Sequence, residues 1–168
     1  MQMRSAWRAV WLAPLAAIVL LCAAGDARAG HSIETQYALI RYDEETQLND
    51  FLWRITGSRL SPGLTAAEPV KTRVDELTDR VMAMLDIYPQ TFRFEILITT
   101  EAGVTGPLAH YAHGSDKRIY VSPSTVTDGI LAHEIAHAVI CAQFAPPPPE
   151  KAQEILARYV DENLWSDN

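Results

Sequence analysis

The stretch of sequence that most constrains the fold covers residues 129–142, where apolar side chains occupy nearly every position. These apolar residues include Ile130, Leu131, Ala132, Ile135, Ala136, Ala138, Val139 and Ile140. A helix that is apolar all round belongs in the interior of a domain rather than on its surface. The same stretch contains His133, Glu134 and His137, and burying these polar side chains costs several kcal/mol unless a metal ion or hydrogen bonds satisfy them.

The three polar residues form the pattern H-E-x-x-H, and their spacing suits a metal site. On a helix, residues four positions apart lie about 40° apart around the axis, so His133 and His137 project from one face and can bind a single ion. Glu134 lies beside that ion, where its carboxylate can accept a proton from a metal-activated water. The pattern therefore predicts zinc bound by His133 and His137, with Glu134 as the general base of a hydrolytic reaction.

Sequence on either side of this motif resembles the zincin metallopeptidases. The segment GILAHEIAHAV, residues 129–139, looks like the active-site helix of that family. The segment EILARY, residues 154–159, resembles the E-G-x-A-x-Y segment of the gluzincin branch, although an isoleucine replaces the usual glycine. Residues 108–122 are similar to the hairpin before the zinc helix, whose edge strand usually pairs with the substrate backbone. The resemblance implies a zinc peptidase in which Glu154 is the third zinc ligand.

Helical geometry alone leaves the third ligand open, because three acidic side chains share one stripe of the downstream helix. Glu150, Glu154 and Asp161 lie within about 40° of one another on a helical wheel. Glu150 adjoins Pro149 in the first turn, where a carboxylate offsets the helix dipole. Asp161 lies about 10 Å further along the axis than Glu154, where it is a candidate to orient a ligand histidine. Only Glu154 matches the family pattern.

Several further side chains are candidates to stabilise the negatively charged oxygen that forms during amide hydrolysis. They are His110, Tyr111, His113, Tyr120 and Tyr159. Each of them is also an ordinary strand or core residue. Tyr159 falls on the apolar side of its helix with Ile155 and Val160, which indicates a packing role.

Periodicity along the rest of the chain predicts a domain of the α+β class. The predicted strands and hairpin arms cover residues 37–42, 92–100, 108–113 and 118–122. The predicted helices cover residues 44–55, 70–88, 123–141 and 150–164. Ser122 or Ser124 is the expected cap of the third helix. The prolines at 146–149 are expected to be a stiff spacer between the last two helices, with an exposed linker or a partner-binding segment as the alternative.

Residues 1–29 have the layout of a secretory signal peptide. A basic start leads into an uncharged apolar run at 11–24, and small residues at 27 and 29 stand where a signal peptidase reads. The apolar run is shorter than the roughly 20 residues that a membrane-spanning helix needs. Removal of this leader takes Cys22 with it, so Cys141 is left without an internal disulfide partner and is expected to be a buried thiol.

The remaining chain, residues 30–168, has the size of one domain. The formal net charge of the whole chain is −7, which argues against nucleic acid and anionic membrane surfaces as partners. We therefore expect a single zincin-like domain, periplasmic or secreted, that carries one zinc ion and hydrolyses peptide or protein substrates. Two alternatives stay open: a catalytically silent zinc module of the same fold that binds a peptide or protein partner, and a metal-free domain with hydrogen-bonded core histidines.

The leader gives a first testable prediction. Processing is expected after Ala29, so N-terminal sequencing of the exported protein should read Gly-His-Ser-Ile. Recovery of the chain with its intact Met1 start in the membrane fraction would show that the leader is an anchor instead.

Overall fold

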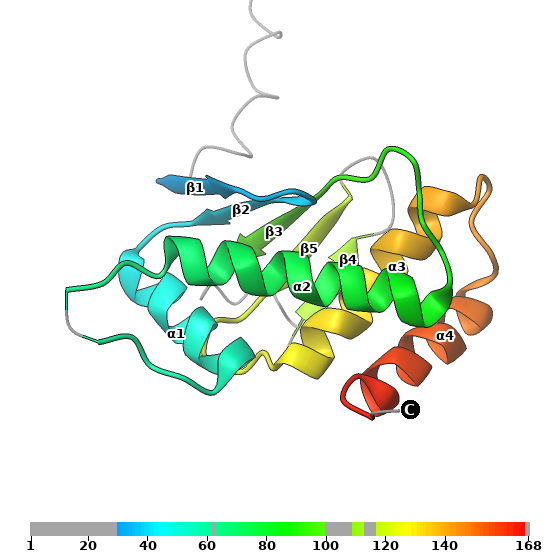
Figure 1. Ribbon diagram of the computed structural model, residues 1–168. Helices are drawn as coiled ribbons and strands as arrows, with labels where there is room; N and C mark the ends of the chain where they lie inside the picture. Colours follow the sequence, from blue (N-terminus) through cyan, green and yellow to red (C-terminus); the bar gives the residue numbers. More distant parts are fainter. Residues whose placement is uncertain (1–29, 62, 100–108, 113–116, 167–168) are drawn as a thin grey trace, which may run out of the picture.

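The computed structural model describes residues 30–61, 63–99, 109–112 and 117–166, and the predicted leader lies outside these ranges. Within them, four helices and a five-stranded mixed sheet form an α+β fold (Figure 1), which confirms the predicted class. The helices are α1 (Glu45–Thr56), α2 (Ala67–Leu85), α3 (Asp128–Gln143) and α4 (Glu150–Asn163). The strands are β1 (His31–Glu34), β2 (Ala38–Tyr42), β3 (Phe94–Ile98), β4 (Ala109–Ala112) and β5 (Arg118–Val121). None of the described helices is long and apolar enough to cross a membrane.

The sheet has the strand order β1-β2-β3-β5-β4. Its central strands β2, β3 and β5 are parallel, whereas β1 and β4 pair antiparallel at the two edges. The β4–β5 pair confirms the predicted hairpin arms, and the turn at 113–116 lies outside the described residues. β1 is an addition to the predicted strands. Because β4 is an edge strand that also contacts α3, one strand edge lies next to the helix that carries the motif.

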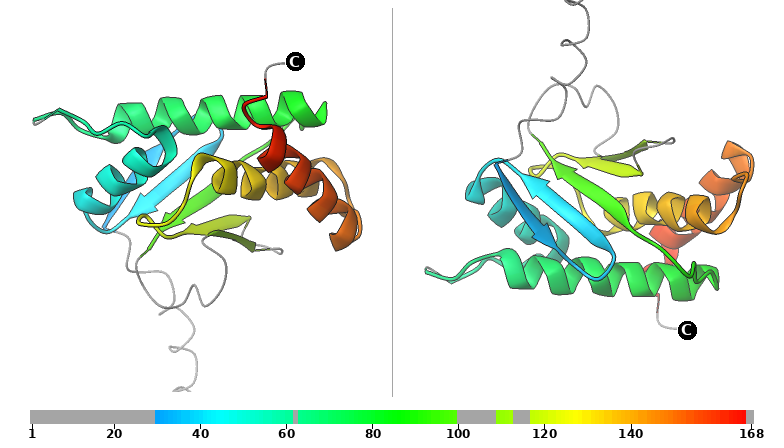
Figure 2. Two further views of the ribbon diagram at one scale, coloured as in Figure 1. Left: turned by 90° about the horizontal axis from the view of Figure 1, so that it is seen from below. Right: turned by 90° about the horizontal axis from the view of Figure 1, so that it is seen from above.

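Alternation along the strands places one face of the sheet in the core. Ile40, Ile96 and Ile119 stand side by side on β2, β3 and β5, and none of them has exposed surface. The helices gather on this face, as both views in Figure 2 show. On the opposite face, Glu95 pairs with both Arg41 and Arg118. The residues that the motif brings together therefore belong to the helix-covered side.

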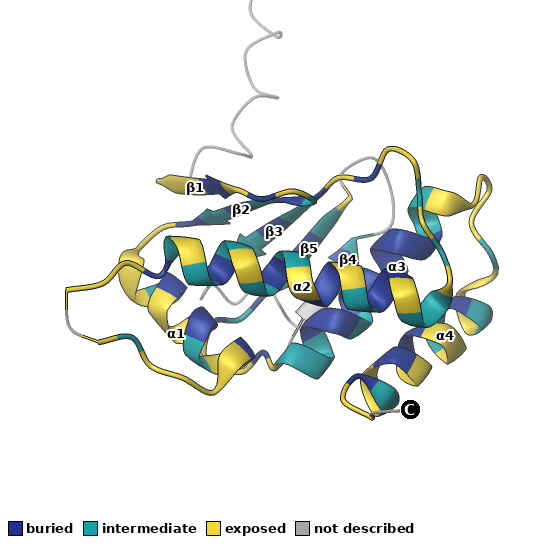
Figure 3. Cartoon of the chain, in the orientation of Figure 1, coloured by how far each residue is buried: buried dark blue, intermediate teal, exposed yellow. Residues whose placement is uncertain are grey.

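α2 packs against α1, α3 and β1 with one buried stripe, which is dark blue in Figure 3. Its buried residues include Val70, Val74, Leu77 and Val81, which repeat at three and four positions. The helix ends at Leu85, not at Tyr88 as the periodicity predicted, because Asp86 adopts a left-handed conformation with φ of 52° that closes the last turn. Tyr88 lies beyond the end of α2 and is 60% exposed, so the predicted end of this helix was wrong.

α3 is the buried helix that the sequence predicted. Its buried residues are Leu131, Ala132, Glu134, Ile135, Ala136, His137, Ala138, Val139 and Ile140. The helix begins later than predicted, because residues 123–125 form a separate turn. Its cap is Thr127, whose side chain accepts a hydrogen bond from the Ile130 amide at 3.3 Å, so the prediction of Ser122 or Ser124 was wrong.

α4 confirms the predicted last helix, but only part of its expected apolar side is buried. Its buried side chains are Gln153, Ala157 and Val160, followed by Leu164 at the end of the helix. Ile155 is 62% exposed and Tyr159 is 47% exposed, so the packing role predicted for Tyr159 was wrong. The small side chain of Ala157 allows a close approach to the neighbouring helices, and the larger Ile155 and Tyr159 turn outward.

Trp165 ties the end of α4 to the rest of the domain. Its indole N–H donates a hydrogen bond of 2.8 Å to Oδ2 of Asp128, the first residue of α3. The guanidinium carbons of Arg73 and Arg80, both on α2, lie 4.7 and 4.9 Å from the centre of the Trp165 ring. One half-exposed side chain thus connects α4 with both α2 and α3.

Replacement of Trp165 should loosen this connection. Trp165→Ala removes a hydrogen bond to a carboxylate and two cation–π contacts, so we expect the free energy of unfolding to fall by about 1–3 kcal/mol. Trp165→Phe keeps a ring for the arginines but loses the N–H donor, so its effect should be smaller. Chemical denaturation measures both variants, and a Phe variant less stable than the Ala variant would contradict this account.

Candidate metal centre

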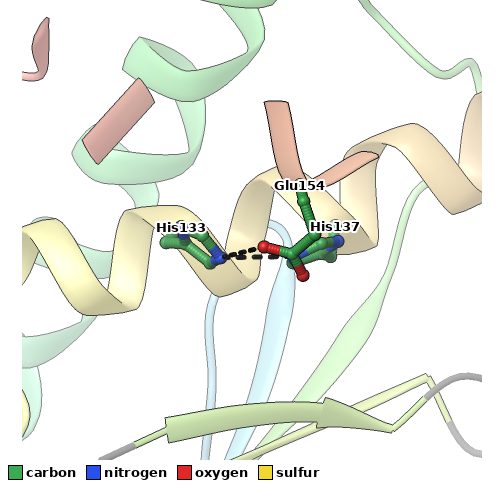
Figure 4. Close-up of side chains that lie close together, drawn as sticks. All are labelled: His133, His137 and Glu154. Atoms are coloured by element: carbon green, nitrogen blue, oxygen red, sulfur yellow. Dashed lines mark hydrogen bonds and ion pairs between the residues drawn. The ribbon is translucent and has the colours of Figure 1, made fainter. Parts of the chain in front are cut away.

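Three of the predicted site residues meet between α3 and α4 (Figure 4). His133 and His137 project from α3, and Glu154 reaches them from α4. The Nε2 atoms of the two histidines are 3.3 Å apart. Oε2 of Glu154 lies 3.6 Å from Nε2 of His133, and Oε1 lies 3.3 Å from Nε2 of His137. Among the described residues, these three form the group of side chains that could hold a metal ion.

The direction of α4 determines which acidic residue faces the histidines. Asp161 packs against Gly129 near the beginning of α3, whereas Gln153 contacts Cys141 near its end, so the two helices run antiparallel. Asp161 therefore lies about one helical turn before His133, and the orienting role predicted for it has no contact to support it. Glu150 is exposed in the first turn of α4, which leaves Glu154 beside the imidazoles.

The spacing of the candidate ligand atoms is compatible with a bound zinc ion. Zinc bonds of about 2.0–2.1 Å place neighbouring ligand atoms about 3.3 Å apart around a tetrahedral centre. The two Nε2 atoms have that separation, and each has a different oxygen of Glu154 within 3.6 Å. With one ligand atom taken from each residue, all three lie within 4.8 Å of one another. Two imidazoles and one carboxylate also leave a fourth position open, which is typical of catalytic rather than structural zinc sites. The residues present therefore fit one zinc ion.

The group is enclosed on the α3 side and open on the α4 side. The side chain of His137 is 5% exposed and that of His133 is 22% exposed, whereas that of Glu154 is 45% exposed. A small ion or the carbonyl group of a substrate can thus approach past α4 while α3 stays in the core.

Glu134 is buried next to the group and held by the edge strand. Its Oε2 accepts a hydrogen bond of 2.7 Å from the backbone amide of Tyr111 on β4. Burial raises the pKa of the Glu134 carboxyl to about 7; the hydrogen bond from Tyr111 lowers it, and the charge of Glu154 raises it further. The backbone of β4 and the carboxylate of Glu134 thus lie in direct contact at one end of the group.

The structure adds Gln153, a residue that the motif did not single out. Its carboxamide is buried and contacts His137, with 3.4 Å between Gln153 Oε1 and His137 Nδ1. The sequence shows a polar residue directly before Glu154, but it does not show which face of α4 is buried. A contact between Gln153 and His137 could therefore not be predicted from the sequence.

The five candidates for stabilising a negatively charged oxygen differ in where the structure places their side chains. Tyr111 is buried, which raises its pKa to about 12. Tyr120 neighbours the buried Ile119 and Val121 on β5, points to the opposite face of the sheet, and contacts Arg118 there. Tyr159 is on the exposed side of α4. The His110 side chain and all of His113 lie outside the described residues.

Comparisons with protein-family models, curated proteins and solved structures gave no match to this chain. What the site can do is therefore inferred from its own side chains.

The geometry predicts how zinc affinity depends on the acidic residues of α4. Purified protein should bind one zinc ion per chain, and Glu154→Ala should weaken that binding by more than the roughly 10- to 100-fold loss typical of an outer-shell partner. Glu150→Ala and Asp161→Ala are matched controls on the same helix and should bind zinc like the parent protein. Competition with a chromophoric chelator measures all three variants. If Glu150→Ala loses zinc and Glu154→Ala retains it, the third ligand is Glu150, one helical turn earlier on α4, and the assignment of Glu154 is wrong.

Proposed function

We propose that this protein is an exported zinc metallopeptidase of the zincin type, similar to the gluzincin branch. His133, His137 and Glu154 would hold the zinc ion, and Glu134 would be the general base. The observation that carries this proposal is the convergence of His133, His137 and Glu154, whose ligand atoms lie within 4.8 Å of one another, together with the buried carboxyl of Glu134 directly after His133 in the sequence.

Each residue of the group has a defined task in this proposal. Zinc held there would supply Lewis-acid chemistry, which activates water and polarises a carbonyl group. Glu134 would accept the proton of the attacking water and pass it to the leaving amine. Burial of α3 keeps His133 and His137 in place, because their helix cannot shift without disturbing the core.

The edge strand supports a peptide as the substrate. β4 is at the edge of the described sheet, and the Tyr111 amide points from β4 to Glu134 on α3. An extended peptide that pairs with the edge strand of a sheet gains backbone hydrogen bonds that do not depend on its sequence. A peptide paired with β4 would therefore run beside Glu134, with its amide groups near the candidate metal centre.

The order of the elements also supports a zincin-like fold. A hairpin with an edge strand, β4–β5, precedes the helix that carries the motif, and a ligand-bearing helix follows it. The leader at 1–29 is the basis for proposing export, and the acidic net charge of −7 fits a substrate other than nucleic acid.

One contact favours a second candidate, a catalytically silent module that binds zinc and a partner peptide. Oε2 of Glu134 is bonded to the Tyr111 amide, so this carboxylate also has a structural task in joining α3 to β4. In such a module Glu134 would hold the strand edge in position, and no proton would be transferred.

Substitution of Glu134 separates the two candidates. Glu134→Gln keeps an oxygen that can accept the hydrogen bond from Tyr111 but removes the proton acceptor. We expect zinc binding to stay and hydrolysis of a mixed peptide library to fall by about 10²- to 10⁴-fold.

Glu150→Gln is the matched control, because it makes the same chemical change on an exposed residue of α4. It should retain full activity. Parent protein that is loaded with zinc and cleaves no peptide would favour the binding module, and unchanged turnover in Glu134→Gln would exclude Glu134 as the base.

A further inference from the structure

Gln153 has a buried carboxamide with partners on both of its ends. The residue is 4% exposed. Its Nε2 lies 2.8 Å from the carbonyl oxygen of Pro148, and its Oε1 lies 3.4 Å from Nδ1 of His137 and 3.4 Å from the thiol of Cys141. The side chain thus links the proline segment, α4 and the buried part of α3.

The carbonyl of Pro148 determines which way the carboxamide faces. A backbone carbonyl oxygen can only accept a hydrogen bond, so the NH₂ group of Gln153 must point to it. The Gln153 oxygen therefore points to His137. The backbone amides of Ala152 and Gln153 also donate to Pro149, at 2.8 and 3.2 Å, which anchors the first turn of α4 to the same segment.

The direction of this chain of hydrogen bonds determines where His137 carries its proton. An amide oxygen can only accept, so the contact with Gln153 is a hydrogen bond when Nδ1 of His137 carries the proton, and Nε2 of the neutral ring then keeps its lone pair. Nε2 is the atom that lies 3.3 Å from Glu154. A histidine in this tautomer is ready to bind a metal through Nε2.

We propose that Gln153 is the positioning residue of the metal centre, because it fixes the Nδ1–H tautomer of His137 through a hydrogen-bond relay that begins at Pro148. This inference rests on the proposed zinc site. It also gives the proline segment a role: proline residues have restricted backbone angles, so the carbonyl of Pro148 is a fixed acceptor at the start of the relay.

Two substitutions test the carboxamide. Gln153→Leu removes both ends and should weaken zinc binding by about 10- to 100-fold, the usual loss for a partner of a ligand histidine. Gln153→Glu keeps an oxygen for His137, and its second oxygen replaces the donor to Pro148 when the buried carboxyl is protonated, so it should bind zinc nearly as tightly as the parent protein. If Gln153→Glu loses as much affinity as Gln153→Leu, the oxygen is not what matters, and the proposal is wrong.

Cys141→Ala is the matched control, because it removes the thiol that also contacts Gln153 Oε1 and leaves the side chains of Gln153 and His137 unchanged. It should bind zinc like the parent protein. An equal loss in Cys141→Ala and Gln153→Leu would show a general disturbance of the contact between α3 and α4 and would overturn the assignment.

The tautomer can also be read in the parent protein without any metal or substitution. Long-range ¹H–¹⁵N spectra at about pH 8, above the ordinary imidazole pKa of about 6.5, should show the His137 proton on Nδ1. A proton on Nε2 would refute the relay whatever the variants do. If the tautomer is as expected and the parent protein binds no zinc, the proposed function fails and the relay stands. If the parent protein and Gln153→Leu bind zinc equally tightly, the zinc site stands and the relay fails.

Discussion

The structure depends on the burial of one helix that contains two imidazoles and a carboxyl group. α3 contacts α2, α4 and two strands of the sheet, so its buried side chains cannot reach water without opening the domain. Its polar groups are satisfied locally: Tyr111 donates to Glu134, Gln153 faces His137, and Glu154 lies beside His133. No buried side-chain nitrogen or oxygen in the described part of the chain lacks a hydrogen-bond partner. The cost of burial is thus offset without disrupting the core.

Much of this arrangement could be predicted because it follows from local periodicity. Four-residue spacing fixed the common direction of His133 and His137, and the apolar flanks of α3 predicted its burial. Alternation on β3 and the paired runs of β4 and β5 are equally local signals. Where prediction went wrong at a helix end, as at Tyr88 and at the cap of α3, the cause was backbone conformation that side-chain polarity does not report.

The features that the sequence did not predict depend on tertiary packing. The wheel placed Glu150, Glu154 and Asp161 on one stripe, and only the antiparallel contact of α4 with α3 decides which of them meets the histidines. The same contact buries Gln153 and exposes Tyr159, the reverse of what hydrophobicity suggests. β1 is a four-residue edge strand with Ile33 as its buried residue. One buried position is too weak an alternation to predict a strand from the sequence, and only the pairing with β2 reveals it.

The division of the ligands between two helices has a consequence for how the protein is made. α3 leaves the ribosome first with only two of the three ligands, and the third arrives when α4 has been synthesised and has docked in reverse direction along it. With the zinc site as proposed, a nascent chain would retain the ion less firmly than the finished domain. Metal acquisition would then be a late event in biosynthesis, coupled to tertiary folding, and in an exported chain it would be deferred to the compartment where folding is completed.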